Sequence, residues 1–277
     1  MAMKGGDRLR WIVLFAVACL WLLPIVSLVL FSFAPSSQIL GGKLIPSSYT
    51  LSNYVTALTD AGRGVSIPQA MANSALIMAM QVAGILLLDI PAAYAFGRLR
   101  WPGRDLAFAL VLLTMMMPGI LEVLSLYEIM SGFGLVDTIY AVVLPGLPRV
   151  VGIFILRQFF RELPKEMEDA ARMDGAGSFQ IFWHVMVPLA RPAVLTLSVL
   201  TALYSWNNFL WPLIITNSPA SMTVPVAIAY LSADTSAILN YTVILAASFL
   251  TALPMILIFL LGQKYIVGGM RPTAGIK

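Results

Sequence analysis

The sequence predicts an all-α polytopic membrane protein with six transmembrane helices. Hydrophobic residues make up 60% of its 277 residues and charged residues only 11%, whereas a soluble domain carries about 25% charged residues. The mean hydropathy is +0.89. Six apolar runs reach the roughly 20 residues that a helix needs to cross the hydrocarbon core. They lie near residues 11–33, 70–97, 106–131, 139–160, 192–215 and 240–263.

The first run follows basic residues, as the core of a signal peptide would, and Ser32 and Ala34 resemble a cleavage site. Its apolar core is longer than the roughly 7 to 15 residues typical of a signal peptide. We therefore expect a retained anchor. Residues 1–69 are predicted to form this span and an outer loop, and residues 70–277 the core of the protein.

Basic residues are distributed unequally between the two sides of the predicted spans. Cytoplasmic loops carry an excess of Lys and Arg, so the richer side is predicted to be cytoplasmic. It holds Lys4, Arg8, Arg10, Arg98, Arg100, Arg104, Arg157, Arg161, Lys165, Arg172, Arg191, Lys264, Arg271 and Lys277, against Lys43 and Arg63 opposite. Both termini and residues 163–191 are then cytoplasmic. The net charge of +4 follows from this topology and does not indicate nucleic-acid binding.

A polar segment, EMEDAARMDGAGSFQIFWHVMVPLARP at residues 166–192, interrupts the apolar sequence. Pro164 suits the first position of a helix, and Gly175 suits its left-handed end. One face of this helix is predicted to carry Leu163, Met167, Ala170 and Ala171. Ser178 can cap a second short helix, with Phe179, Phe182, Val185 and Met186 as its apolar side chains. The pattern favours either an amphipathic linker on the lipid surface or a docking element for a partner.

The string DAARMDGA, residues 169–176, resembles the "Glu-Ala-Ala, two residues, Asp-Gly-Ala" loop of ABC importer permeases. Further stretches resemble the carbohydrate-uptake branch, particularly the second permease subunit of maltose-type importers. They are Asn73 and Ser74, PAAYAFGRLRWPGR (91–104), LRQFFRELP (156–164), VPLARP (187–192) and WNNFLWPL (206–213). The resemblance covers most of the chain from about residue 70 onward.

The resemblance implies that residues 163–191 form a coupling loop before the last two spans, seated in a cleft of a cytoplasmic ATPase. The residues implied in this contact are Met167, Asp169, Ala170, Ala171, Asp174, Gly175 and Ala176. It also implies a second, homologous permease, two copies of the ATPase and an extracytoplasmic substrate-binding protein near the outer loop, about Thr216 to Asn240. Two departures stand out. Asp169 replaces the family's Glu, and Gly177 follows the motif, where we expect it to loosen the turn.

The chain carries no phosphate-binding motif of the form Gly, four residues, Gly-Lys-Ser/Thr. Its one Gly-Gly-Lys, at 41–43, is followed by Leu44 and has Ser37 in place of the first glycine. We therefore expect no enzyme and no cofactor on this chain, with ATP and Mg bound by the partner ATPase. His184 and Cys19 are the single histidine and cysteine, which argues against a metal site and an intrachain disulfide.

The ionisable residues predicted to lie deep in the bilayer, where a charge is costly, are Asp89, Glu122 and Arg149. Such residues usually face the bundle interior or a wet cavity. Counted from the outer ends of their spans, Glu122 and Arg149 are each roughly ten residues, or about 15 Å, deep, so they could meet at the midplane. Pro118 and Gly119, and LPGLP at 144–148, interrupt the two spans there, as in the binding regions of some transporters. Three interpretations remain open for Glu122 and Arg149. They could form an ion pair that fixes helix packing, form a pair that lines the solute path, or make no contact.

A second polar cluster lies in the predicted fifth span and consists of Tyr204, Trp206, Asn207, Asn208 and Trp211. Aromatic faces beside amides suit a sugar, although Trp and Tyr also gather at membrane interfaces. We expect Trp211 to be interfacial and at least one of the two Asn side chains to point into the bundle.

The sequence thus predicts a permease subunit of an ATP-driven ABC importer in a bacterial or archaeal cytoplasmic (inner) membrane. It is expected to form half of the path for a sugar or sugar derivative. The candidate path residues are Glu122, Arg149, Tyr204, Trp206, Asn207 and Asn208. The alternatives are an ion-coupled secondary transporter, with Asp89, Glu122 and Arg149 as coupling groups, and an importer of a non-sugar solute. An intramembrane enzyme is disfavoured because no nucleophile with a base is found.

Overall fold

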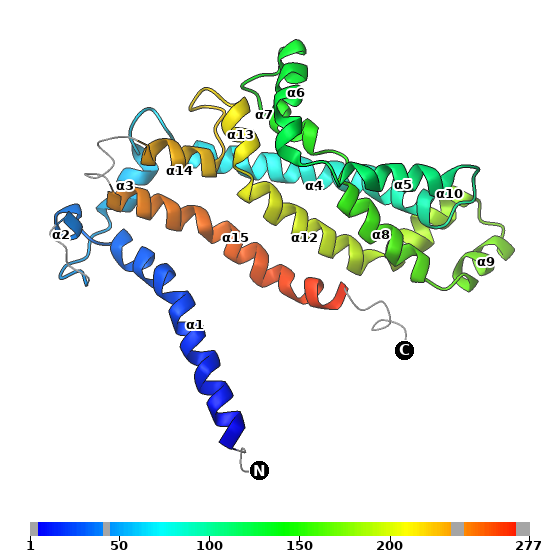
Figure 1. The fold of residues 1–277 in the computed structure, drawn as a ribbon, viewed down its shortest axis with the longest axis horizontal. Coiled ribbons are helices and arrows are strands. Elements are labelled where there is room, and N and C mark those ends of the chain that lie inside the picture. The colour runs from blue at the N-terminus through cyan, green and yellow to red at the C-terminus, as the bar shows by residue number, and fades with distance from the viewer. Residues whose placement is uncertain (1–4, 41–44, 234–240, 270–277) are drawn as a thin grey trace. The chain divides into compact units, whose positions relative to one another are not determined.

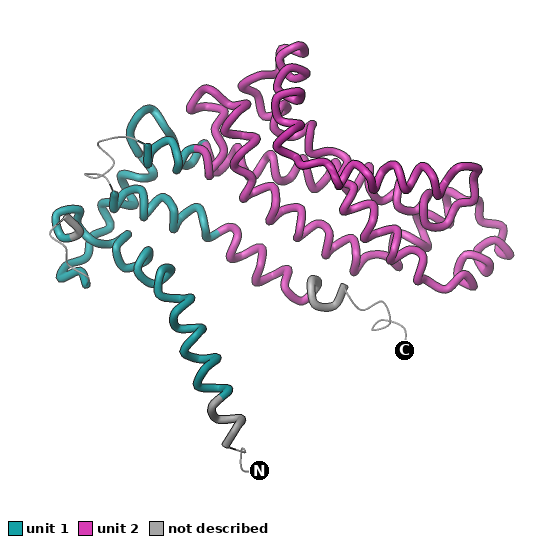
Figure 2. The backbone as a smooth tube through the Cα atoms, viewed as in Figure 1, with its two compact units in different colours: residues 1–69, 227–253 teal, residues 70–226, 254–277 magenta. Residues whose placement is uncertain are grey.

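A computed structural model describes residues 5–40, 45–233 and 241–269 (Figure 1). All regular secondary structure in these ranges is helical. The chain forms two compact units, residues 1–69 with 227–253 and residues 70–226 with 254–277 (Figure 2). Four residues used to predict the orientation, Lys4, Lys43, Arg271 and Lys277, lie outside the described residues, as do Gly41, Gly42 and residues 234–240 of the predicted outer loop.

Three helices are long and apolar enough to cross a membrane, and three bent pairs would raise the number of spans to six. The long helices are α1 (Gly5–Ser32), α4 (Ile67–Gly97) and α15 (Tyr241–Gly269). The first bent pair is α5 (Arg104–Thr114) with α6 (Gly119–Gly132), and the second is α7 (Ile139–Val143) and η1 (Leu144–Gly146) with α8 (Val150–Glu162). In the third, α12 (Arg191–Asn207) follows the short helices of residues 178–189. The predicted all-α membrane fold is confirmed, with six as the upper count for the described residues.

The helix breaks occur where the sequence predicted them. The chain bends by 94° between α5 and α6, at Pro118, and by 43° between residues 139–146 and α8, at Pro148. Proline lacks the N–H that continues a helical ladder and disfavours a helical residue before it. Each bend therefore follows from local backbone chemistry.

The first unit contains α1, α2 (Ser36–Leu40), α3 (Ser52–Thr59), most of α14 (Val224–Ser232) and the first half of α15. Its described parts are joined by the buried amide of Asn53. The Asn53 Nδ2 donates to the carbonyls of Ser32 (2.8 Å) and Ala34 (2.9 Å), and its Oδ1 accepts from the Thr242 hydroxyl (3.2 Å). A satisfied buried amide of this kind fixes one arrangement of the three segments.

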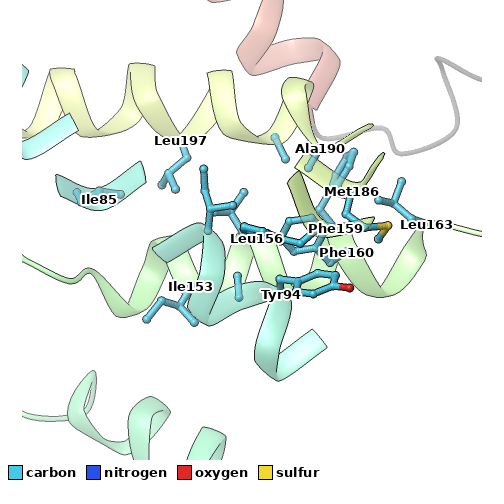
Figure 3. Close-up of a cluster of buried hydrophobic side chains, with 14 of the residues drawn as sticks. Ile85, Tyr94, Ile153, Leu156, Phe159, Phe160, Leu163, Met186, Ala190 and Leu197 are labelled. Atoms are coloured by element: carbon cyan, nitrogen blue, oxygen red, sulfur yellow. The ribbon is translucent and has the colours of Figure 1, made fainter. Parts of the chain in front are cut away.

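The second unit is built around α4, α8 and α12, which share a core of large apolar side chains (Figure 3). Tyr94 lies at its centre, with ring centroids 5.7 Å from Phe160 of α8 and 5.0 Å from Phe182. Gly152 of α8 permits the close packing of these helices. A Cβ there would collide with the Asp89 carboxylate of α4 and lie 3.1 Å from Leu197 of α12.

At the other end of this unit, Asp137 fastens the α6–α7 turn to the segment after α13 (Leu210–Ile215). Its Oδ1 accepts hydrogen bonds from the backbone N–H groups of Asn217 (2.8 Å) and Ser218 (3.0 Å) and from the Ser221 hydroxyl. The same segment is held by Asn73, whose amide donates to the carbonyls of Ala220 and Met222 at 2.8 and 3.0 Å. This part of the predicted outer loop is therefore ordered by α4 and Asp137 together.

Acid should weaken the Asp137 contact. Burial raises the pKa of this carboxyl, but hydrogen bonds from Ser221, Ser218 and Asn217 lower it by more, giving a pKa of about 2 against an ordinary 3.8. The carboxylate therefore contributes stability above pH 3.8, and this contribution is lost as pH falls through about 2. Because Asp137 is partly exposed, we expect Asp137→Asn to lower the free energy of unfolding by about 1 kcal/mol at pH 7.

Thermal unfolding of the purified wild type and Asp137→Asn at pH 7 and pH 2.5 measures this contribution. The difference between the two proteins should shrink at pH 2.5. An equal difference at both pH values would contradict the carboxylate's role.

Candidate functional site

The coupling segment, residues 163–191, folds into α9 (Glu166–Met173), α10 (Ser178–Ile181), the π-helical turn η2 (Phe182–Met186) and α11 (Val187–Leu189). Gly175 ends α9 with φ of 85°. Its N–H donates to the Arg172 carbonyl at 3.0 Å, and the Ala176 N–H donates to the Ala171 carbonyl at 3.0 Å. These two bonds form a Schellman motif, so the predicted left-handed helix end at Gly175 is confirmed.

Three details of the predicted segment are wrong. Pro164 precedes α9 instead of beginning it, and Ser178 is the first residue of α10, with Gly177 as its N-cap. Gly177 has φ of −73°, which most residues can adopt. Its N–H donates to the Gln180 Oε1 at 2.9 Å. The prediction that Gly177 loosens the turn is therefore wrong.

The inner face of α9 carries a buried carboxylate that sequence patterning missed. Glu168 is 6% exposed and forms ion pairs with Arg98 at 2.7 Å and Arg172 at 3.1 Å. The Arg98 guanidinium also donates to the Leu163 carbonyl at 2.7 Å. The Arg98 side chain, just beyond the end of α4, thus contacts both the segment before α9 and the buried face of α9.

Asp169, which takes the place of the family's Glu, lies on the exposed side of α9. Its carboxylate pairs with Arg172 at 2.9 Å, and its side chain is 68% exposed. The shorter side chain therefore contacts its own helix. Asp174 caps the end of α9 and is also exposed.

The apolar side chains of the coupling segment form a buried set and an exposed set. Phe182 and Met186 are four residues apart and buried, and Ala171 and Ala176 pack against the same core. Phe179 and Trp183, also four apart, are 75% and 52% exposed. Of the four apolar side chains predicted for the second short helix, Phe179 is therefore exposed, whereas Phe182 and Met186 are buried.

The outer face of α9 consists of Met167, Ala170 and Met173. Met173 is 88% exposed and Met167 44% exposed. The predicted apolar face of Met167, Ala170 and Ala171 is therefore divided, since Ala171 packs inward. Together with Phe179 and Trp183, these side chains form an exposed apolar surface, which we call the outer coupling face.

A second candidate region lies where α8 begins. The Arg149 guanidinium stacks 3.7 Å from the ring centroid of Tyr204 on α12, and the Arg149 N–H donates to the buried Asp89 carboxylate at 3.1 Å. Arg149, Tyr204 and Thr201 line a cavity of about 180 Å³. The Thr201 hydroxyl is buried and makes no hydrogen bond within the described residues. The site therefore offers a cation, an aromatic face and an unpaired hydroxyl.

Glu122 does not join this cavity. The structure shows no ion pair between Glu122 and Arg149, both of which are described, and Glu122 is an exposed residue in the first turn of α6. The matched depth assumed a straight third span, whereas the 94° bend turns α6 away from the line of α5. The Arg149 guanidinium instead stacks on Tyr204, and the Arg149 backbone N–H donates to Asp89.

The other predicted path residues are divided between buried and exposed positions. Trp206 is buried; Asn207 is exposed and donates to the Leu203 carbonyl of its own helix at 2.7 Å; Asn208, half-buried, ends α12. The Trp211 indole donates to the Ala141 carbonyl of α7 at 2.9 Å, so it makes a packing contact within the second unit. Within the described residues, no group of three His, Cys, Asp or Glu side chains is placed to hold a metal ion.

Comparison with known proteins identifies the family. Residues 89–272 match the family described as "Binding-protein-dependent transport system inner membrane component". This chain belongs to that family. Membership supports an inner-membrane permease component and does not support the ion-coupled alternative.

Similar proteins include sugar permeases. The chain is 34% identical over 284 residues to the arabinooligosaccharides transport system permease protein AraQ of Halalkalibacterium halodurans, covering 100% of both. It is 36% identical to the trehalose transport system permease protein SugB of Mycobacterium tuberculosis, covering 91% of this chain and 92% of that one. A solved bacterial ABC transporter "involved in the import of the acidic polysaccharide alginate" has a chain with TM-score 0.84 and 25% identity, covering 96% of this chain and 99% of that one.

The buried carboxylate of α9, Glu168, should contribute more to the stability of this helix than the exposed carboxylate, Asp169. Both pair with Arg172, but only Glu168 is buried. Glu168→Gln leaves Arg98 as a buried charge without its counter-charge, which costs about 3 kcal/mol. Asp169→Asn removes an exposed pair worth less than about 1 kcal/mol. The backbone amides of α9 should exchange hydrogen about 100-fold faster in Glu168→Gln than in the wild type. In Asp169→Asn their exchange rate should be close to that of the wild type. Similar exchange in both variants would contradict this assignment.

Proposed function

We propose that this chain is a permease subunit of an ATP-driven ABC importer for a sugar or sugar derivative, coupled to a separate ATPase through residues 163–191. The outer coupling face supports this most directly. It presents Met173, Phe179 and Trp183 to the surroundings on a segment that Arg98 and Glu168 fix to the permease. Exposed apolar residues on an ordered support are typical of a protein contact. The named relatives supply the solute class.

The proposed complex contains a second, homologous permease, two ATPase copies that bind ATP and Mg, and an extracytoplasmic substrate-binding protein. This chain needs no cofactor or nucleic acid, and it sits among membrane lipid. The ordered segment 217–224 suits a contact with the binding protein, because Asn73 and Asp137 hold its backbone in one conformation. Both termini and the coupling segment are placed in the cytoplasm on the Lys and Arg distribution.

The solute path is assigned to the side of α8 and α12 that carries Arg149, Tyr204 and Thr201. Their cavity combines an aromatic face with polar groups, which suits sugar C–H faces and hydroxyls. Movement of the ATPases would be transmitted through α9 to α4 by the Arg98–Glu168 pair. A non-sugar solute remains a second candidate, because the sn-glycerol-3-phosphate permease protein UgpE of Yersinia pestis is 33% identical over 198 residues, covering 71% of this chain and 70% of that one.

Gly175→Val tests the coupling role. A β-branched residue at φ of 85° costs roughly 1–2 kcal/mol and should redirect the chain between α9 and α10. No atom lies within 4 Å of a Cβ at this position, so the change acts through the backbone alone. We expect the variant to insert and pair with its partner permease, yet retain about tenfold less ATPase on purification.

Gly177→Val is the matched control. Its backbone is extended, and an added Cβ would come no closer than 3.9 Å to another residue. It should keep its ATPase. If Gly175→Val retains ATPase and supports uptake as well as Gly177→Val does, residues 163–191 are not the coupling element.

Cysteine labelling tests the proposed orientation. In a Cys19→Ala background, an impermeant maleimide added to whole cells should label Ala220→Cys and spare Gly177→Cys, since both positions are exposed in the structure. The reverse pattern would invert the assigned topology.

A further inference from the structure

A basic cavity of about 870 Å³ is lined by residues at the ends of α4 and α8 and the beginning of α9. Figure 1 shows these helix ends at one end of the second unit. Its wall includes the six basic residues Arg98, Arg100, Arg104, Arg161, Lys165 and Arg172. The acidic residues in the wall are Glu168 and Asp169. The cavity therefore carries an excess of positive charge beside the coupling segment.

Three of these cations are already paired. Arg98 and Arg172 bind Glu168 and Asp169, and Arg104 binds Asp105 at 3.0 Å.

The other three are unpaired. Arg100, Arg161 and Lys165 are exposed, and their side chains make no hydrogen bond or ion pair within the described part of the chain. Three positive charges thus line one cavity without an ion-pair partner within 4 Å, although like charges repel at short range. An anion bound between them would remove this repulsion.

Three exposed apolar side chains lie in or next to the cavity, one in its wall and two in a neighbouring cavity that also contains Asp105. Leu99, in the cavity wall, and Trp101, beside it, are each 39% exposed, and Leu106, at the start of α5, is 68% exposed. Arg100 and Arg104 also line a neighbouring cavity that contains Trp101 and Leu106. Cations beside exposed apolar and Trp side chains match an amphiphile with an anionic head, and Trp residues favour the interface between lipid and water.

We propose that this cavity binds the phosphate of an anionic phospholipid, with Arg100, Arg161 and Lys165 as its ligands. Basic pockets between membrane helices bind such headgroups. A free phosphate would satisfy the cations but not the three exposed apolar side chains. The site is separate from the solute cavity at Arg149 and from the outer coupling face, and it requires only that the chain lie in a membrane.

The test uses the complete importer, purified in detergent and exposed to equal amounts of phosphatidylglycerol and phosphatidylcholine, with bound lipid counted by native mass spectrometry. The site variant is Arg100→Gln/Arg161→Gln/Lys165→Gln. The control, Arg10→Gln/Arg191→Gln/Lys264→Gln, removes the same charge from exposed positions outside the cavity. Each basic contact changes lipid affinity about fivefold, so the site variant should lose its preference for phosphatidylglycerol by at least about tenfold.

Retention of that preference in the control and in Arg100→Lys/Arg161→Lys supports the site and shows that charge, and not folding, is responsible. Equal loss in both triple variants overturns it. Two further results also overturn it. If the permease pair alone binds phosphatidylglycerol but the complex with ATPase does not, the cations contact the ATPase. If millimolar inorganic phosphate displaces the lipid from the wild type, the ligand is a free phosphate.

Discussion

The buried ion pair between Arg98 and Glu168 is the contact on which the coupling segment depends. A buried charge is tolerated when it is paired and hydrogen-bonded, and the loss of either partner is costly. Arg98 binds both the Glu168 carboxylate and the Leu163 carbonyl, so it fixes the start of α9 and its rotation about its own axis. That rotation turns Ala171 toward the core and Met173 outward. The exposed face proposed for the ATPase thus follows from one buried ion pair.

The solute cavity depends on a different local constraint, the bend before α8. The chain turns at Pro148, and Arg149 is the N-cap of α8. Its backbone N–H donates to the Asp89 carboxylate. Gly152, one turn on, allows α8 to approach α4 and α12 closely. Broken helices are tolerated at membrane depth where they line a cavity or are buried in protein. Arg149 and Tyr204 therefore lie side by side although they belong to different helices.

Local chemistry was largely predictable from the sequence. Apolar run lengths gave the helices, proline gave their bends, and Gly175 gave the end of α9, because each is decided within a few residues. Long-range partners were not predictable. Helical periodicity cannot predict that Glu168 is buried and Asp169 exposed. The burial of Glu168 depends on its ion pair with Arg98, which is distant in sequence. Depth counting paired Glu122 with Arg149 because it could not include a 94° bend. Phe179 and Phe182 are equally apolar, and only the packing of Tyr94 on Phe182 separates them.

Coupling through the Arg98–Glu168 pair requires that α9 move with α4 as one body while the importer works. Spin labels at Leu87→Cys on α4 and Glu166→Cys on α9, both exposed positions, would report their separation in a Cys19→Ala complex. If the two helices move together, the distance distribution should be the same in the nucleotide-free and ATP-trapped states, and broader when Glu168→Gln is added. A distance that changes with nucleotide in the complex with Glu168 intact would contradict coupling through this pair, because α9 would then move independently of α4.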